Sequence, residues 1–323
     1  MSFSSEVKAE LAKNISSARH CRIAELSGMM SMVADVWYRN GSLFKICITT
    51  ERSIIAKTMA SLIKVLFDIR MECSVKRTGS NSRIYRMVLD QPREIERILQ
   101  TLKLSPDFEI SQKGVTKVSC QDMVVNRMVV QQQCCKRAFI KGAFMTSGSV
   151  SDPNKGYHLE IVCDNEERAG MIEKILAELD IESRIIARKK YSVCYIKDGT
   201  MIVDMLNIMG AHISLMNMEN VRILKDISNN VNRRVNCEAA NLNKTVSAAV
   251  RQIQDINYVI ETRGITYLPD NLRELAELRL EEPDASLKEL GEMMNPPIGK
   301  SGVNHRLRKI SEIAEDLRQK SYV

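Results

Sequence analysis

Long apolar runs are absent from this 323-residue chain, which excludes a membrane-spanning helix because such a helix needs about 20 predominantly apolar residues. The first residues, MSFSSEVKAELAKNI, also lack an apolar segment behind a basic one, so they do not have the pattern of a secretory signal peptide. They place Phe3, Val7, Leu11 and Ile15 on one stripe, which predicts a short amphipathic helix within residues 1–20. We therefore expect a cytoplasmic protein with no membrane partner.

Paired cysteine motifs are also absent. The nine cysteines are odd in number, none is spaced as CxxC, and Cys134 and Cys135 are adjacent. This pattern argues against a disulfide framework and against a thiolate zinc site. We expect free thiols in a reducing compartment, no bound metal and no cofactor. The histidines, which likewise show no metal-ligand spacing, are His20, His158, His212 and His305.

The composition is that of an ordinary globular protein with a basic balance. Charged residues make up 27% of the chain and hydrophobic residues 44%, as in soluble domains. The length is enough for two or three domains that each have a core. The net charge of +7 favours a polyanionic partner without identifying one.

Two segments, residues 21–104 and 132–210, repeat one pattern. Each has the order helix, strand, helix, two strands, helix, with SLFKICITT as the first strand of one and YHLEIVCD as the first strand of the other. Matching residues of the two segments keep nearly constant offsets. Gly142 follows Gly28 by 114 residues, Asp180 follows Asp68 by 112, and Asp198 follows Asp90 by 108. We therefore predict a pseudo-twofold α+β domain over residues 21–215.

The helix that opens each half resembles the LAGLIDADG motif of homing endonucleases. The nine residues Ile140–Gly148, IKGAFMTSG, form the closer copy, and Leu26–Ala34, LSGMMSMVA, form a weaker one. The resemblance implies that the two motif helices pack closely through their small residues. It also implies an acid at the eighth position of each motif, which holds the catalytic metals.

The acids at these positions are missing. The eighth positions are Val33 and Ser147, and neither supplies the carboxylate that Mg²⁺ prefers. Asp35 and Asp152 lie nearby but out of register, whereas two-metal cleavage needs both acids aimed at one point. We therefore expect no catalytic residue and no enzymatic activity.

Basic residues occur on the predicted hairpin strands of both halves. In the resembled enzymes those strands form the DNA-facing saddle, so these residues are candidates for secondary DNA contacts. The alternative is that they solvate a sheet edge and deter pairing with other strands. They are Lys76, Arg77, Arg83 and Arg86 in the first half, and Arg184, Arg188, Lys189 and Lys190 in the second.

Apolar residues recur at three- and four-residue steps from Leu224 to Ile260. This spacing predicts an amphipathic helical linker over residues 216–263, as one helix or as two in series. Its polar face includes NNVNRRVN and NLNK, which are rich in Asn, Arg and Lys and poor in acids. Arg233 and Arg234 are candidate phosphate contacts, and an ordinary solvated face is the alternative.

Residues 264–323 predict a bundle of three short helices. Asn271 can cap the first helix, LRELAELRLEE, and Ser286 opens the second with a capping box. The third follows GKS at residues 299–301, the letters that end a nucleotide-binding P-loop. A P-loop would need a glycine where Met294 stands and a strand before it, so we expect no nucleotide site.

The third helix combines an apolar face with a basic one. Val303, Leu307, Ile310 and Ala314 share a face that must pack on the first two helices. Acids are absent from residues 295–311, so the opposite face offers hydrogen-bond donors to DNA in the major groove. An ordinary solvated basic helix is the alternative. The candidate DNA-binding residues are Lys300, Ser301, Gly302, Asn304, His305, Arg306, Arg308 and Lys309.

These candidates have different expected roles. His305 and Lys309 lie nearest the centre of the exposed face, so we expect them to reach base edges. Lys300 and Arg306 flank that face and are expected to reach phosphates. Gly302 removes a side chain where backbone could approach a phosphate.

The acid-less duplicated domain, the NRRVNCEAANLNKT helix and the segment from LPDNLRELAELRLEE to GKSGVNHRLRKI together resemble the WhiA family over essentially the whole chain. The resemblance implies a bacterial DNA-binding regulator in which a degenerate homing-endonuclease domain is tethered to a helix-turn-helix resembling sigma-factor region 4. It further implies transcriptional control of sporulation in filamentous relatives, and a role in cell division and chromosome segregation elsewhere. The expected partners are double-stranded DNA of the nucleoid and, beside it, another transcription factor or RNA polymerase.

Three functions are compatible with these patterns. The first is a non-catalytic, sequence-specific DNA-binding regulator. A divergent nuclease is disfavoured by Val33 and Ser147. A protein-interaction scaffold, whose helix-turn-helix docks on another protein, would lack the steep fall in DNA affinity with salt that phosphate contacts cause.

Overall fold

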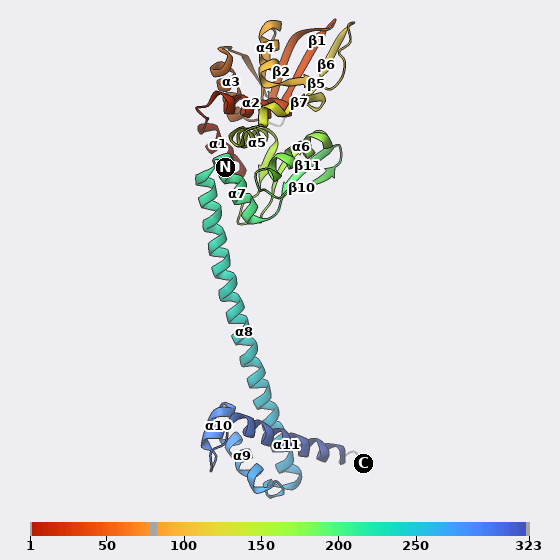
Figure 1. Ribbon diagram of the computed structural model, residues 1–323. Helices are drawn as coiled ribbons and strands as arrows, with labels where there is room; N and C mark the ends of the chain where they lie inside the picture. The colour runs from red at the N-terminus through yellow and green to blue at the C-terminus, as the bar shows by residue number, and fades with distance from the viewer. Residues whose placement is uncertain (1, 78–82, 321–323) are drawn as a thin grey trace. The chain divides into compact units, whose positions relative to one another are not determined.

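The computed structural model describes residues 2–77 and 83–320 (Figure 1). The chain divides into two compact units, Met1–Leu224 and Lys225–Val323. Each unit has a hydrophobic core of its own. Among the described residues, no helix combines the length and the apolar character that crossing a bilayer requires.

The N-terminal unit contains two halves with the same order of elements. Helix α1, Phe3–Lys13, precedes them. The first half comprises α2 (Arg19–Val33), β1 (Ala34–Arg39), β2 (Ser42–Thr50), α3 (Ser53–Phe67), β3 (Glu72–Arg77), β4 (Arg83–Leu89) and α4 (Pro92–Leu102). The second comprises α5 (Gln133–Ser147), β8 (Gly148–Val150), β9 (Leu159–Cys163), α6 (Glu166–Ala177), β10 (Arg184–Arg188), β11 (Tyr191–Ile196) and α7 (Gly199–Met209). Between the halves lie β5 (Leu104–Pro106), β6 (Val115–Val118), η1 (Cys120–Asp122), β7 (Met123–Val125) and η2 (Arg127–Val130).

The α+β class is confirmed, but each half has one strand more than the sequence pattern predicts. Strand β1 follows α2 directly, because the β-branched and aromatic side chains of Val36, Trp37 and Tyr38 favour extended structure where the pattern suggests more helix. Strand β8 is the three-residue segment GSV. A segment so short carries no periodic signal, so the sequence could not reveal it.

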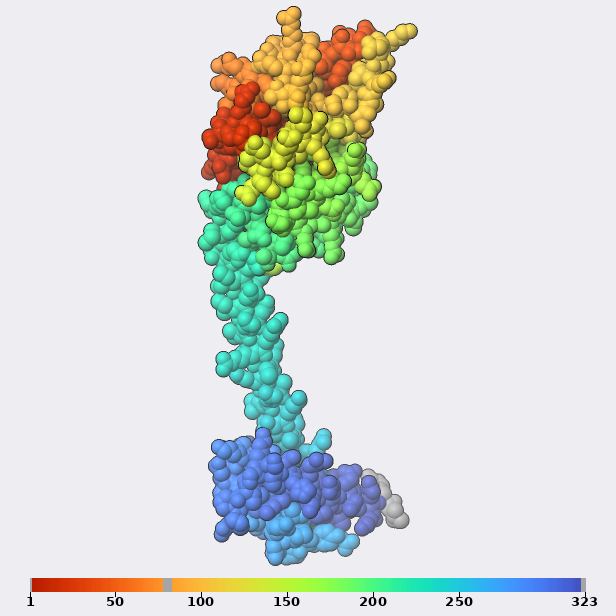
Figure 2. Space-filling view, viewed as in Figure 1, coloured from red at the N-terminus to blue at the C-terminus, as the bar shows by residue number. Residues whose placement is uncertain are grey.

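Each half forms an antiparallel sheet. The strand orders are β3-β4-β2-β1-β6 in the first sheet and β10-β11-β9-β8 in the second, and β5 pairs with β7 separately. Buried residues alternate along the strands, as with Leu159, Ile161 and Cys163 of β9. These residues pack with the helices in one continuous core, and the two halves lie directly against each other (Figure 2).

The motif helices α2 and α5 pack backbone against backbone. A Cβ atom on Gly28 would lie 2.3 Å from the Phe139 carbonyl oxygen, and one on Gly142 would lie 2.1 Å from that of Glu25. Both distances are far below van der Waals contact, so only glycine fits at these two positions. The close packing that the motif implied is therefore present, and it fixes the register of one half on the other.

Charged side chains are buried around this helix pair. Lys141 Nζ lies 2.9 Å from Glu25 Oε1, and the two side chains are 6% and 1% exposed. Burial raises the pKa of Glu25, and the Lys141 ammonium opposes that rise. Lys141 also donates to the backbone carbonyl of Asn14, which ties the segment after α1 to α5.

The C-terminal unit is helical. Helix α8, His212–Arg263, contributes its later part to this unit and is followed by η3 (Ile265–Tyr267), α9 (Asp270–Glu281), α10 (Leu287–Met293) and α11 (Lys300–Lys320). The predicted capping box at the start of α10 is present, with Ser286 and Glu289 bonding each other's backbone N–H groups. Helix α9 begins at Asp270, so its N-cap is Pro269, which makes no side-chain cap hydrogen bond, rather than Asn271.

The turn between α10 and α11 is tight. Ile298 N donates to Gly291 O at 2.9 Å, and a Cβ atom on Gly291 would lie 2.2 Å from the Ile298 carbonyl oxygen. Glycine at this position therefore lets the turn cross α10. The contact fixes where α11 begins relative to the other two short helices.

Much of the apolar stripe on α8 is exposed. The side chains of Ile227, Val231, Val235 and Leu242 are each more than half exposed, whereas Ile256 and Val259 are buried in the core of the C-terminal unit. The apolar spacing that predicts α8 therefore corresponds to a packed face only towards the C-terminal end of that helix.

Replacing Gly142 by alanine should destabilise the N-terminal unit, because the new methyl group collides with the Glu25 carbonyl. Overpacking of this kind costs about 1–3 kcal/mol. Gly170→Ala is the matched control, since a Cβ there meets nothing within 4 Å in helix α6. The control should leave stability equal or raise it by about 0.5–1 kcal/mol. Denaturant unfolding of both variants measures the difference, and equal stabilities would contradict the close packing.

Candidate nucleic-acid interface

Helix α11 turns one face to the core and another to solvent. Val303, Leu307, Ile310 and Ala314 are buried, as their spacing predicts. Lys300 is the first residue of the helix, and Ser301 is the second. Of the candidate DNA-binding residues, those with exposed side chains are Lys300, Ser301, Asn304, His305, Arg308 and Lys309.

The exposed residues of α11 divide into two rows. Asn304 and Lys300 line a groove with α8 and the start of α10, and Arg308 lines another with α8. His305 and Lys309 line neither groove and lie on the outer side of the helix, one turn apart with Ser301. The outer row is therefore the part of α11 that faces solvent away from both grooves.

Two predicted residues have structural contacts. Arg306 is partly buried and donates from Nη1 to the carbonyl oxygen of Asn271 at 3.1 Å, so it joins α11 to α9. Gly302 is also partly buried, and a Cβ there would lie 3.6 Å from the side chain of Ile298. An added methyl group would therefore make an ordinary van der Waals contact with Ile298.

The structure adds two basic residues that the sequence reasoning missed. Lys244 and Arg251 of α8 line the groove of about 580 Å³ that also contains Arg308 of α11. Lys244 belongs to the acid-poor NLNK stretch, and that composition could have identified it as a candidate phosphate contact. Arg251 follows that stretch by seven residues, two helical turns, and only the packing of α8 beside α11 brings it to Arg308.

Arg233 and Arg234 are exposed on α8 but lie apart from this groove. Eleven residues separate Arg233 from Lys244, which is about 16 Å along the helix. Arg234 Nε lies 3.2 Å from Glu238 Oε1, one turn further on, and both side chains are largely exposed. The two arginines therefore form a separate basic patch.

The basic residues of the first sheet are divided between its faces. Successive strand residues point to opposite faces, and Arg77 pairs with Arg83 while Ser74 pairs with Arg86. Lys76 and Arg86 therefore share the face that is turned away from the buried Met87, and Arg77 and Arg83 share the other. Arg86 also donates from Nε to the sulfur of Cys47 at 3.1 Å.

The basic residues of the second sheet are closer to a single surface. Arg184 and Arg188 share one face of β10, and Arg188 Nη1 lies 3.4 Å from Glu160 Oε2 of β9. Lys189 and Lys190 form the exposed turn to β11, where Lys189 has a positive φ of 56°. Only part of the predicted saddle charge therefore lies on the open faces of the sheets.

The ends of the motif helices do not provide a magnesium site. Val33 and Ser147 are the last residues of α2 and α5, as the motif predicts. The nearest alternative acids are engaged elsewhere: Asp35 Oδ2 lies 2.8 Å from Lys117 Nζ, and Asp152 Oδ1 accepts from the backbone and side chain of Asn154. The donor set that two catalytic metals require does not fit these residues.

At the opposite ends of the same helices, the structure brings together four side chains that sequence spacing kept apart. His20 and Cys21 of α2 meet Cys134 and Cys135 of α5, with all four ligand atoms within 4.8 Å of one another. The search for CxxC and similar metal-ligand spacings did not find this cluster, because it compares residues that are close in sequence. The packing of α2 against α5 brings these two pairs together. The usable signal was the 114-residue offset of the duplication, which relates His20 to Cys134 and Cys21 to Cys135.

This architecture defines a class of protein: a duplicated LAGLIDADG-like domain without its metal-binding acids, followed by a helix-turn-helix unit. Family models match both parts. The WhiA N-terminal LAGLIDADG-like domain matches residues 19–105, the WhiA LAGLIDADG-like domain residues 136–228, and the WhiA C-terminal HTH domain residues 231–314. The chain belongs to the WhiA family.

Relatives match along the whole length. The chain is 47% identical to the probable cell division protein WhiA of Lachnoclostridium phytofermentans, over 99% of this chain and 100% of that protein. It is 46% identical to the protein of the same name from Lachnospira eligens, over 99% and 98%. A crystal structure of full-length WhiA from Thermatoga maritima aligns with a TM-score of 0.60 at 25% identity, over 98% of this chain and 99% of that one.

Arg306→Ala should loosen the contact between α9 and α11, because it removes the hydrogen bond to Asn271. Loss of one such bond costs about 0.5–1.5 kcal/mol. Hydrogen exchange of the full-length protein should then be faster at the start of α9. Arg308→Ala removes the same charge from an exposed position and should leave that exchange unchanged. Equal exchange in both variants would mean that Arg306 has no structural role.

Proposed function

We propose that this protein is a non-catalytic, sequence-specific DNA-binding regulator that acts in cell division. The observation that carries the proposal is the outer row of α11, Ser301, His305 and Lys309, exposed on a helix whose opposite face is packed into a core. Hydroxyl, imidazole and ammonium groups offer donors to base edges, and no carboxylate stands among them to repel phosphate. A rigid helix with such a row is what reading of the major groove requires.

The family supports the biological setting. The relatives with 47% and 46% identity are named probable cell division proteins, and the match covers the whole chain. We extend the proposal to transcriptional control linked to division, chromosome segregation and, in spore formers, sporulation. The protein would then act at the nucleoid, beside RNA polymerase or another transcription factor.

The groove between α8 and α11 adds phosphate contacts to this reading surface. Lys244, Arg251 and Arg308 line one groove, and Arg308 immediately precedes Lys309 of the outer row in sequence, so we expect a DNA backbone beside that row to meet these three cations. Such contacts fix orientation and supply most of the non-specific affinity. Arg184, Arg188, Lys76 and Arg86 on the open faces of the sheets are a weaker, secondary surface for DNA.

His305→Ala and Lys309→Ala should each weaken binding to a specific site by about 1–3 kcal/mol and change binding to random duplex little. The duplexes are those recovered by genome-wide mapping of bound sites, and affinity is measured by fluorescence anisotropy. Lys320→Ala, at the exposed far end of α11, is the charge-matched control and should bind as the parent does. Circular dichroism establishes that each variant is folded.

Two outcomes would contradict the proposal. Folded His305→Ala and Lys309→Ala proteins that bind recovered sites with full affinity would show that this face does not read DNA. Affinity for duplex that is indifferent to salt would favour the scaffold, because counterion release makes each phosphate contact salt-dependent.

The purified protein should leave supercoiled plasmid intact in Mg²⁺ or Mn²⁺, since Val33 and Ser147 provide no carboxylate at the ends of the motif helices. Gel electrophoresis of the plasmid is the measurement. Nicking that disappears when Asp35 and Asp152 are both changed to asparagine would restore the nuclease alternative. Nicking that persists in that variant would indicate a contaminant.

A further inference from the structure

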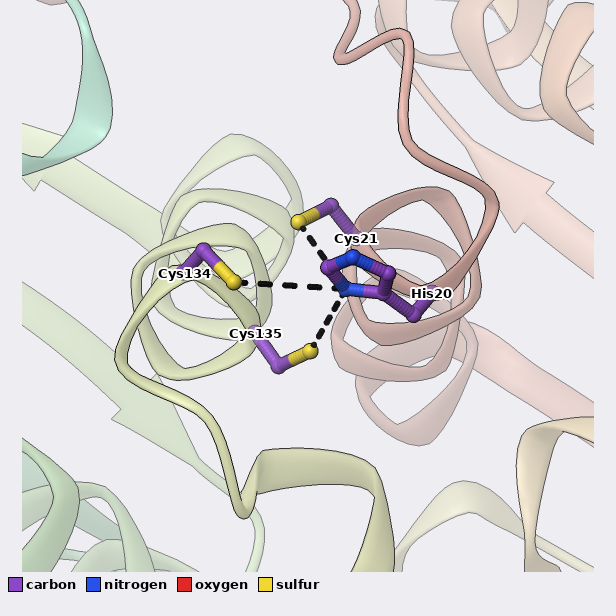
Figure 3. Close-up of side chains that lie close together, drawn as sticks. All are labelled: His20, Cys21, Cys134 and Cys135. Carbon is purple, nitrogen blue, oxygen red and sulfur yellow. Dashed lines mark hydrogen bonds between the residues drawn. The ribbon is translucent and has the colours of Figure 1, made fainter.

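Four soft ligands meet where the two motif helices begin. His20 and Cys21 are the second and third residues of α2, and Cys134 and Cys135 are the second and third residues of α5 (Figure 3). Their side chains point towards one another across the helix pair. Within the described part of the chain, no other group of three or more His, Cys, Asp or Glu side chains converges in this way.

The distances are those of a nearly closed tetrahedron. His20 Nδ1 lies 3.2 Å from the sulfur of Cys135, 3.4 Å from that of Cys21 and 3.9 Å from that of Cys134. In a tetrahedral zinc site, bond lengths of about 2.0 Å to nitrogen and 2.3 Å to sulfur place the nitrogen roughly 3.6 Å from each sulfur. The same bond lengths place the sulfurs about 3.8 Å apart, so all six ligand separations are reached by shifts of about 1 Å or less.

The backbone holds the two ligand pairs in register. His20 and Cys21 precede Gly28 by eight and seven residues. Cys134 and Cys135 precede Gly142 by the same two distances. These two glycines are the positions at which the helices touch. The contacts of Gly28 with Phe139 and of Gly142 with Glu25 allow no sliding of one helix along the other. The cluster is therefore a product of the fold rather than of a flexible loop.

We propose that His20, Cys21, Cys134 and Cys135 bind one Zn²⁺ ion as a structural Cys₃His site. Three thiolates and one imidazole are an ordinary donor set for structural zinc, and thiolate-rich tetrahedral sites disfavour Mg²⁺, Ca²⁺ and Mn²⁺. All four positions are taken by protein ligands, so no position is left open for water or a substrate. Burial raises the pKa of the Cys21 thiol, and it raises that of Cys135 to about 12, so in the metal-free protein these two ligands are protonated thiols. A bound Zn²⁺ would displace those protons, because a thiol that coordinates a metal is deprotonated.

The site joins the two halves of the N-terminal unit. It lies about 18 Å from the helix ends at Val33 and Ser147, because twelve residues separate Cys21 from Val33 and Cys135 from Ser147. It is therefore distinct from the place where the resembled nucleases hold their catalytic metals. Cys21 and Cys135 are each 5% exposed, whereas His20 and Cys134 are exposed, so an ion can enter from solvent and be held against the core.

The experiment uses the full-length protein, purified with a reductant and without chelator. Elemental analysis should find about one zinc per chain. Titration of the zinc-free protein with Co²⁺ should give the intense visible bands of a tetrahedral site and a near-ultraviolet thiolate charge-transfer band. Chelation of the zinc should lower the thermal unfolding temperature, because binding to the folded state alone stabilises that state.

Exposed ligands provide variants that should still fold. Cys134→Ser and His20→Asn should each weaken metal binding at least tenfold and abolish the chelator effect on unfolding, with far-ultraviolet circular dichroism unchanged. Cys73→Ser and Cys237→Ser remove exposed thiols on β3 and α8 and are the matched controls, which should bind as the parent does.

Three results would overturn the proposal. The first is wild-type protein that binds no Zn²⁺ or Co²⁺ stoichiometrically under reducing conditions. The second is metal that stays bound at full stoichiometry in the Cys134→Ser and His20→Asn variants. The third is a disulfide between Cys21 and Cys134 or Cys135 in protein prepared with reductant, found by alkylation and mass mapping, which would make the cluster a redox pair instead.

Discussion

The contact between the backbones of α2 and α5 is the constraint on which the N-terminal unit depends. At Gly28 and Gly142 the helices approach so closely that even a methyl group would collide with a carbonyl oxygen. Backbones at that distance have one register, so each half carries its sheet to a fixed place relative to the other. Everything that the helices present at either end, Val33 with Ser147 or the His–Cys pair with the Cys–Cys pair, meets because of this register. This packing is present although Val33 and Ser147 stand where the LAGLIDADG motif carries acids.

Buried charged side chains also hold the two halves of the N-terminal unit in one relative position. Lys141 and Glu25 face each other across the helix pair, and removal of one partner from such a pair typically costs about 3–5 kcal/mol because the other charge stays buried. Arg168 of α6 is buried too, and its guanidinium donates to backbone carbonyls of Ser31, Cys120 and Met123. The side chain therefore joins the second half to the end of α2 and to the segment between the halves. Sliding of one half past the other would leave these groups unpaired.

The sequence predicts most of the elements because their signals are local. Helical spacing located α11 and its buried face, and Ser286 located the start of α10. The sequence pattern did not predict strand β8, because three residues are too few to show a period. It did not predict strand β1, because an apolar run directly after a helix has the pattern of a longer helix. The candidate sites were less predictable, since they depend on which helices meet. Arg251 lines the groove only because α8 packs beside α11, and Arg306 donates to the carbonyl oxygen of Asn271. The His20–Cys21 pair and the Cys134–Cys135 pair lie more than a hundred residues apart in the chain.

The two ends of the motif helices differ in the sign of the helix dipole and in the side chains that they carry. A carboxylate at the C-terminal end of a helix faces the negative end of the dipole, at a cost of about 0.3–1 kcal/mol unless a cation compensates. With Val33 and Ser147 at those ends, neither helix carries that cost. The N-terminal ends have the opposite sign, but burial outweighs the dipoles there and raises the pKa of the Cys21 and Cys135 thiols. Cys21, Cys134 and Cys135 stand within the first turns of the two helices, beside the imidazole of His20. A cation bound among these four side chains would therefore supply the positive charge that the helix dipoles alone do not, and would hold the buried thiols as anions.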